Sequence, residues 1–192
     1  MNLPNKLTLS RVILVPFFML ALLLPESVLS DTASRIVAAV IFLVAALTDM
    51  ADGKIARKYG LVTDVGKFLD TLADKFMIIA AFLGATVKYD ALRPILVWVT
   101  LLVVFRELAV TSLRLIASAK QTVIAAGMSG KIKTVTQCVT VMMILLEPVL
   151  LPFSPFNTAY PITWVCVAVM TFFTVYSGIE YFVRYKDFLA QK

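Results

Sequence analysis

The chain has 192 residues, of which 60% are hydrophobic, and a formal net charge of +6 at pH 7. Soluble domains contain about 45–50% apolar residues, so this composition indicates an integral membrane protein, with residues 1–192 forming one domain. The chain contains no histidine, which excludes Ser-His-Asp and Cys-His mechanisms and leaves carboxylates and metal ions for acid–base chemistry. No nucleic-acid partner is expected.

Apolar runs separated by helix-breaking residues predict an all-α polytopic membrane protein, a bundle of six transmembrane helices with a short N-terminal interfacial segment. The interfacial segment is expected at Met1–Ser10, where Thr8 or Ser10 can cap the following helix. The six spans are expected at residues 10–26, 33–58, 64–87, 92–119, 129–151 and 157–185.

Positive charge is distributed unevenly between the two ends of the predicted bundle. Of 18 Lys and Arg, all except Arg35, Lys88 and Arg93 fall at the end that contains the N-terminus. The positive-inside rule then predicts the cell (cytoplasmic) membrane, with both termini and the active site facing the cytoplasm. The opposite half is expected to be a dry apolar plug, and the charged half a hydrated cavity where a lipid can meet a water-soluble reactant.

Four aspartates lie between the apolar parts of the second and third predicted spans. Within each of two predicted helices, two aspartates and one small residue are spaced three or four residues apart, so they share one face of that helix. The residues are Asp49, Asp52 and Ala56 on the first helix and Gly66, Asp70 and Asp74 on the second. Carboxylates about 4 Å apart repel by roughly 4 kcal/mol at an effective dielectric near 20, so this group predicts a site for hard divalent cations.

Other residues of the same stretch suit a phosphorylated substrate. Gly53 and Gly66 allow a nucleotide or pyrophosphate to approach the backbone, and Arg57 can hold a phosphate with its guanidinium group. The alternative is an ordinary set of ion pairs at a turn between two helices. Their partners would be Lys54, Arg57, Lys58, Lys67 and Lys75.

The aspartate stretch fits D-x2-D-G-x2-A-R-x8-G-x3-D-x3-D at every fixed position, and it resembles the signature of the CDP-alcohol phosphatidyltransferases. The resemblance implies two divalent ions, Mg²⁺ or Mn²⁺, held by Asp49, Asp52, Asp70 and Asp74, with Asp74 also serving as general base. It also implies a site for the CDP part of CDP-diacylglycerol. The residues expected there are Gly53, Ala56, Arg57 and Gly66, with Thr8 and Arg11 as further contributors.

Basic residues further along the chain predict a pocket for a second phosphate. Arg106 and Arg114 lie in R-E-L-A-V-T-S-L-R, and Lys131 and Lys133 lie in S-G-K-I-K-T. For Arg106 the alternative is an internal ion pair with Glu107, and for the lysines it is anchoring to lipid headgroups. Near the C-terminus an aromatic belt at the membrane interface is expected from Tyr176, Tyr181, Phe182 and Tyr185.

These basic motifs, together with N-L-P-N-K-L-T-L-S-R near the N-terminus, resemble the members of the family that use sn-glycerol 3-phosphate as acceptor. The resemblance implies transfer of the phosphatidyl group to that acceptor, with phosphatidylglycerophosphate and CMP as products of anionic phospholipid biosynthesis. The expected partners are both substrates, membrane lipids and a second copy in a homodimer. Two alternatives stay open: a sister enzyme using phosphatidylglycerol, serine or inositol phosphate, and a divalent-cation transporter.

Overall fold

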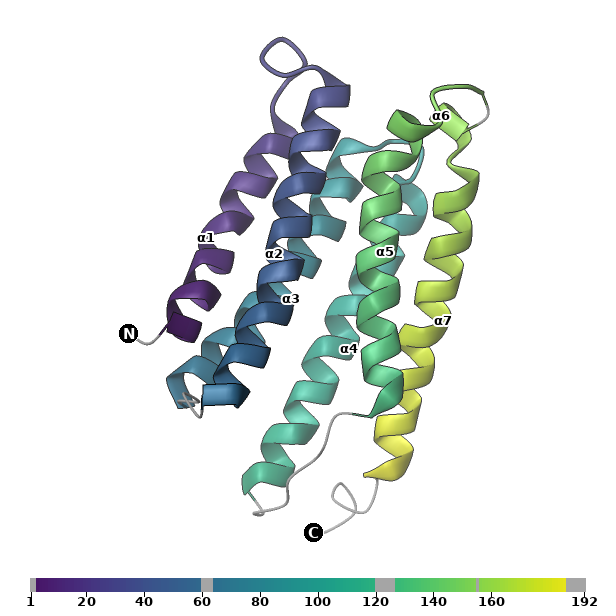
Figure 1. Cartoon of the computed structure of the whole chain (residues 1–192). Helices are drawn as coiled ribbons and strands as arrows, with labels where there is room; N and C mark the ends of the chain where they lie inside the picture. The colour runs from purple at the N-terminus through teal and green to yellow at the C-terminus, as the bar shows by residue number, and fades with distance from the viewer. Residues whose placement is uncertain (1–2, 60–63, 120–126, 155, 186–192) are drawn as a thin grey trace.

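A computed structural model describes residues 3–59, 64–119, 127–154 and 156–185 (Figure 1). It describes the backbone alone at 3–7, 50–59, 64–65, 67–70, 118–119 and 156–157. All regular structure in the described residues is helical, which confirms the predicted all-α class. The helices are α1 (Leu3–Leu23), α2 (Asp31–Tyr59), α3 (Asp64–Lys88), α4 (Arg93–Ala119), α5 (Met128–Leu150), α6 (Phe156–Ala159) and α7 (Pro161–Arg184).

The six long helices lie side by side in two groups of three (Figure 1). Helices α1, α2 and α3 form one group, and α7 packs against both α4 and α5 in the other. Contacts of α3 with α4 and of α2 with α5 join the groups. Consecutive long helices are antiparallel, so α1 begins and α7 ends at the end where α2 leads into α3. This end of the bundle is called the Asp49 end below, and the opposite one the Asp31 end.

The surface and the interior of the bundle have the character expected inside a lipid bilayer. Four helices contain stretches long and apolar enough to cross a membrane, at Asp31–Asp49, Arg93–Ala117, Met128–Leu150 and Pro161–Arg184, and α1 contributes a shorter apolar stretch, Thr8–Leu23. Large apolar side chains such as Trp98, Phe105 and Phe172 are more than 60% exposed. Apolar surface on that scale is stable against lipid and costly against water. The chain is therefore a multi-pass membrane protein.

Two helix boundaries differ from the prediction. Helix α1 begins at Leu3, so Thr8 and Ser10 lie inside the helix rather than at its start. Pro4 permits this, because the first turn of a helix does not need the proline N–H. The last predicted span is divided by Tyr160, whose φ of 52° is left-handed and separates the short α6 from α7.

The prediction that the half of the bundle at the Asp31 end is a dry apolar plug is wrong, because this end contains a buried network of charged and polar groups. The side chain of Arg35 donates to Asp31 Oδ2 at 2.6 Å, to the carbonyl of Ile144 at 3.2 Å and to the Tyr160 hydroxyl at 3.0 Å. Its guanidinium carbon lies 4.1 Å from the centre of the Tyr89 ring. Arg35 therefore links α2 to α5 and to the segment that precedes α7.

A second buried charge at the Asp31 end caps the start of α7. Glu147 is fully buried, and its carboxylate accepts the backbone N–H groups of Ile162 at 2.9 Å and Thr163 at 2.6 Å. It also accepts the Thr163 hydroxyl at 2.6 Å. The first backbone N–H groups of a helix have no partner within the helix, so a carboxylate can accept them. The positive end of the helix dipole also stabilises the negative charge of the carboxylate. Glu147 thereby ties the end of α5 to the beginning of α7.

Candidate active site

Arg11 brings together two of the predicted metal ligands at the Asp49 end. Its Nη1 atom lies 2.6 Å from Asp49 Oδ1 on α2 and also forms an ion pair with Asp74 Oδ1 on α3. The arginine side chain is 3% exposed, whereas the two carboxylates are 39% and 45% exposed. Three helices thus contribute to one charged centre that is open on its carboxylate side.

The backbone places the other two predicted ligands beside this centre. Asp52 lies three residues after Asp49 in α2, and Asp70 lies four residues before Asp74 in α3. These spacings in continuous helices put each pair of Cα positions on one helix face, about 4.5 Å apart along the axis for the first pair and about 6 Å for the second. The side chains of Asp52 and Asp70 lie outside the described residues.

The residues predicted to bind the CDP group lie on the same helix ends. Gly53, Ala56 and Arg57 belong to the last turns of α2, with side chains outside the described part, and Gly66 belongs to the first turn of α3. Thr8 is buried one turn before Arg11 in α1. Helix ends from α1, α2 and α3 therefore surround the acidic centre.

A second polar cluster lies between α4 and α5, around the carboxylate of Glu107. Glu107 Oε1 accepts Arg106 Nη1 at 3.1 Å and forms an ion pair with Lys133 Nζ. Lys133 is 5% exposed, whereas the side chain of Lys131 is exposed. The ion pair expected as an alternative role for Arg106 is present, yet Arg106 Nε is buried without a partner in the described residues.

Tyr181 connects Arg114 to this cluster. Its hydroxyl accepts Arg114 Nη2 at 2.7 Å and the backbone N–H of Gly127 at 3.3 Å, and its ring lies 5.9 Å from the guanidinium carbon of Arg106. Tyr181 is 4% exposed, so its predicted place in an interfacial aromatic belt is wrong. The buried face of α7 includes Thr174, Ser177 and Tyr181, and that spacing could have revealed its inward orientation.

Lys75 lies between the two polar centres. It follows Asp74 in α3, and its ammonium group donates to the Thr111 hydroxyl of α4, which in turn donates to the backbone carbonyl of Glu107 at 2.6 Å. From the sequence, Lys75 is expected only in ion pairs, and Glu107 is expected only as the ion-pair partner of Arg106. Through the Thr111 hydroxyl, Lys75 of α3 is connected to the backbone of Glu107 of α4, between the acidic centre and the basic cluster.

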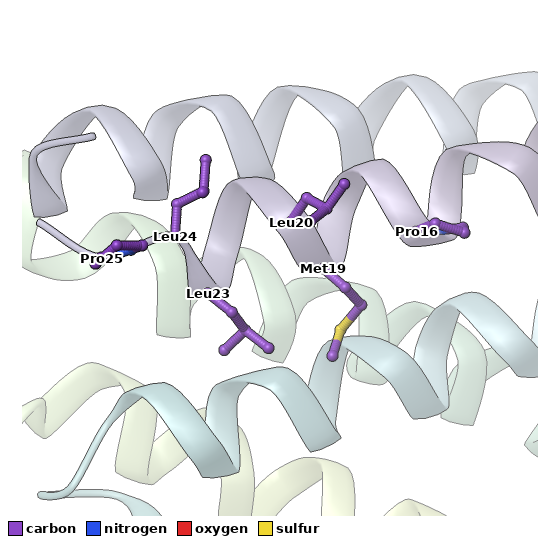
Figure 2. Close-up of a pocket in the computed structure, with 6 residues that line it drawn as sticks. All are labelled: Pro16, Met19, Leu20, Leu23, Leu24 and Pro25. Atoms are coloured by element: carbon purple, nitrogen blue, oxygen red, sulfur yellow. The ribbon is translucent and has the colours of Figure 1, made fainter. Parts of the chain in front are cut away.

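An apolar groove runs along the second half of α1, away from both polar centres. Its volume is about 360 Å³, and Figure 2 shows its lining, Pro16, Met19, Leu20, Leu23, Leu24 and Pro25. None of these six side chains can titrate, so the groove itself carries no acid–base chemistry. It begins five residues, or about 8 Å of helix, beyond Arg11. An acyl chain suits such a surface, whereas a polar reactant does not.

Comparisons with known proteins agree with the motif. A sequence model of the CDP-alcohol phosphatidyltransferase family matches residues 1–176. The chain is 42% identical, over 193 residues covering 95% of it and 94% of the relative, to the CDP-diacylglycerol–glycerol-3-phosphate 3-phosphatidyltransferase of Bacillus subtilis. It is 40% identical to a probable phosphatidylglycerophosphate synthase of Mycobacterium tuberculosis, over 95% of this chain and 81% of the relative.

The similarity extends to a relative from a third genus. The Escherichia coli CDP-diacylglycerol–glycerol-3-phosphate 3-phosphatidyltransferase is 39% identical over 152 residues, 77% of this chain and 78% of the relative. Similarity to enzymes over most of the chain favours the enzyme hypothesis over the transporter hypothesis. The chain belongs to the CDP-alcohol phosphatidyltransferase family.

Proposed function

We propose that this protein transfers the phosphatidyl group of CDP-diacylglycerol to the C1 hydroxyl of sn-glycerol 3-phosphate, producing phosphatidylglycerophosphate and CMP. The observation that carries the proposal is that the side chains of Arg11, Asp49 and Asp74 meet in one place. The chain that contains them is similar, over 95% of its length, to a relative named for these substrates. One domain comprising residues 1–192 would carry the whole reaction.

The donor atoms at the acidic centre fit a divalent cation. One guanidinium nitrogen contacts the carboxylates of both Asp49 and Asp74, so a single cation near that position is within reach of both. Carboxylate oxygens are the preferred ligands of Mg²⁺ and Mn²⁺. Asp49, Asp52, Asp70 and Asp74 would hold two such ions, which neutralise charge on the pyrophosphate and on the departing CMP.

The residues around this centre would bind and orient the CDP group. Gly53, Ala56 and Gly66 leave room for the nucleotide, and Arg57 supplies a guanidinium for a phosphate. Thr8 and Arg11 would contribute from α1. Because divalent cations and Arg11 compete for the same two carboxylates, Arg11 would turn from Asp49 and Asp74 towards the pyrophosphate when cations bind.

Asp74 would accept the proton of the attacking hydroxyl. Its carboxylate is 45% exposed, so an acceptor arriving from the aqueous side can reach it. A carboxylate is a weak base at neutral pH, so holding the hydroxyl in place must supply much of the acceleration.

The basic cluster would hold the phosphate of the acceptor. Arg106 Nε is buried with no partner among the described residues, Lys133 is directed inward, and Arg114 reaches the same region through Tyr181. Lys131 was predicted to join them, but its exposed side chain suits a headgroup contact better.

The surroundings of the site suit a reaction at a membrane surface. The active site would face the cytoplasm from the cytoplasmic membrane, with both termini on that side, because the basic residues cluster at the Asp49 end. The diacylglycerol part of the donor would stay in lipid beside the bundle. A homodimer is also proposed, and the mass of the purified protein in nanodiscs tests it.

The proposed reaction is tested with purified protein in nanodiscs that contain CDP-diacylglycerol. Labelled sn-glycerol 3-phosphate and Mg²⁺ or Mn²⁺ should give labelled lipid and an equal amount of CMP. A chelator should stop turnover, and the metal should restore it; turnover that survives full chelation would contradict the metal proposal. The variants Asp49→Asn and Asp74→Asn should each lower kcat/KM by at least about a thousandfold.

The acceptor is tested separately with phosphatidylglycerol, serine and inositol phosphate in the same assay. Release of CMP with one of these, and none with sn-glycerol 3-phosphate, would assign the chain to a sister activity. The basic cluster favours an acceptor that carries a phosphate, because Lys133 and Arg106 bring two positive charges to the single carboxylate of Glu107.

A further inference from the structure

Gln137 of α5 has a fully buried polar side chain, and its carboxamide has no hydrogen-bond partner among the described residues. Its exposed fraction is 0%, and neither Oε1 nor Nε2 has a hydrogen-bond partner in the described part of the chain. A carboxamide offers two donor hydrogens and an acceptor oxygen, and burying them unpaired is unfavourable. A buried group of this kind calls for a polar ligand or an ordered water molecule.

Neighbouring polar side chains on the buried face of α5 do have protein partners. Lys133, one turn earlier, forms an ion pair with Glu107. The hydroxyl of Thr140, almost one turn later, lies 2.8 Å from the carbonyl of Thr136 and 3.1 Å from that of Cys166. The helix packing thus satisfies the groups on either side of Gln137, which points to a role for its carboxamide outside the packing.

Gln137 lies on the helix that reaches both centres of the proposed active site, because α5 carries Lys133 of the basic cluster and packs against α2 and α3. Four residues, or about 6 Å of helix, separate it from Lys133 in the basic cluster. Helices α2 and α3, against which α5 packs, carry Asp49 and Asp74 of the acidic centre. An acceptor with its phosphate at the basic cluster and its reacting hydroxyl at the acidic centre would pass this position.

We propose that Gln137 binds the C2 hydroxyl of the acceptor and makes the enzyme select for it. This inference rests on the proposed function, in which the acceptor is sn-glycerol 3-phosphate. The C2 hydroxyl of that molecule lies between the reacting C1 hydroxyl and the phosphate. Gln137 Oε1 accepts a hydrogen bond from this hydroxyl, and Nε2 donates one to its oxygen. A site built to pair with a hydroxyl discriminates against an acceptor that lacks it, because the buried carboxamide then stays unpaired.

The experiment compares two acceptors that differ only at C2. These are sn-glycerol 3-phosphate and propane-1,3-diol monophosphate, which keeps the phosphate and the terminal hydroxyl and lacks the C2 hydroxyl. The unmodified protein should have a kcat/KM for sn-glycerol 3-phosphate about tenfold to a hundredfold higher than for the analogue. In Gln137→Met, which keeps the length of the side chain without its hydrogen bonds, the ratio should fall to within about threefold.

Two further variants separate binding from packing. Thr140→Val removes a buried hydroxyl that has protein partners, so it should lower thermal stability and leave the acceptor ratio unchanged. Gln137→Glu retains an acceptor oxygen and should keep part of the discrimination. The KM for CDP-diacylglycerol should be the same in all three variants.

An unchanged acceptor ratio in Gln137→Met would overturn the inference and assign Gln137 a structural role. Should that variant not fold, the ratio in Gln137→Glu decides, and a value equal to that of the unmodified protein overturns the inference. A protein active with sn-glycerol 3-phosphate that does not discriminate between the two acceptors overturns it while the proposed function stands. A protein inactive with both but active with another acceptor overturns the proposed function itself.

Discussion

Arg11 occupies the position between Asp49 and Asp74 that a cation shared by these two carboxylates requires. Its side chain is almost fully buried, so the ion pairs are shielded from solvent on the guanidinium side. Binding of a divalent cation must displace the guanidinium from both aspartates. If the protein binds a metal here as proposed, its apparent affinity would be reduced according to the fraction of molecules in which Arg11 is bound to the two aspartates.

The first prediction concerns this competition. Arg11→Gln keeps a polar side chain and removes the charge, so the protein without substrate should bind Mn²⁺ about tenfold more tightly. Electron paramagnetic resonance of free Mn²⁺ measures the affinity, and Asp49→Asn serves as the control that should weaken it. The KM for CDP-diacylglycerol should rise in Arg11→Gln. An unchanged or lower Mn²⁺ affinity would show that Arg11 does not compete with the metal.

The second prediction separates two lysines of one helix. Lys133 is buried beside Glu107 and Lys131 is exposed, although only one residue lies between them. Lys133→Met should raise the KM for sn-glycerol 3-phosphate about tenfold to a hundredfold, because a charge-assisted contact with the phosphate is lost. Lys131→Met should change it less than about twofold. Equal effects of the two substitutions in steady-state kinetics would contradict this assignment.

At the scale of helices, the two ends of the bundle have different tasks. The Asp49 end contains charges that share partners, whereas the two buried charges of the Asp31 end, Arg35 and Glu147, each have several hydrogen-bond partners within the protein. Arg35 joins α2 to α5 and to Tyr160, and Glu147 joins α5 to α7. The Arg35 contacts hold the two groups of helices together at the end opposite the proposed active site, and the Glu147 contacts join two helices of one group.

The third prediction tests that fixing role. Arg35→Met leaves the buried Ile144 carbonyl and Tyr160 hydroxyl without their guanidinium partner and should destabilise the fold by about 2–3 kcal/mol. Asp31, whose side chain is partly exposed, keeps its ion pair with Lys88. The matched control is Arg93→Met, which removes an exposed ion pair with Asp90 and should cost at most about 1 kcal/mol. Thermal unfolding in detergent measures both. Similar stability losses in the two variants would contradict a special role for Arg35, and the KM for either substrate should not change in folded Arg35→Met.

At the scale of the whole molecule, charge asymmetry and the direction of the helices predict one orientation in the membrane. Basic residues cluster at the Asp49 end, where α1 begins and α7 ends. Our fourth prediction is that a fluorescent protein fused after Lys192 will be bright and that alkaline phosphatase fused there will be inactive. A phosphatase fused within the connection between α1 and α2, after Glu26, should be active. The reverse pattern would place the proposed active site on the other side.

The sequence alone determined the class of protein and most of its helices. Apolar runs of membrane length must form helices, because backbone polar groups in lipid need partners within their own segment. The aspartate spacing determined which residues share a face of α2 and of α3, since helical periodicity is local. Two helix boundaries did not follow from the sequence. Helix α1 begins at Leu3 because its first turn tolerates Pro4, and α7 begins after Tyr160 because that residue is left-handed.

Only the tertiary structure decided which charges meet. Arg11 is 38 residues from Asp49 and 63 from Asp74, and Arg35 is 125 from Tyr160. No local pattern encodes such pairings, because they follow from how six helices pack together. The same packing turned Lys133 and Tyr181 inward and left Gln137 buried with no partner in the part of the chain that the structure describes. Periodicity and spacing thus specified the aspartate motif, while the association of the helices specified its partners.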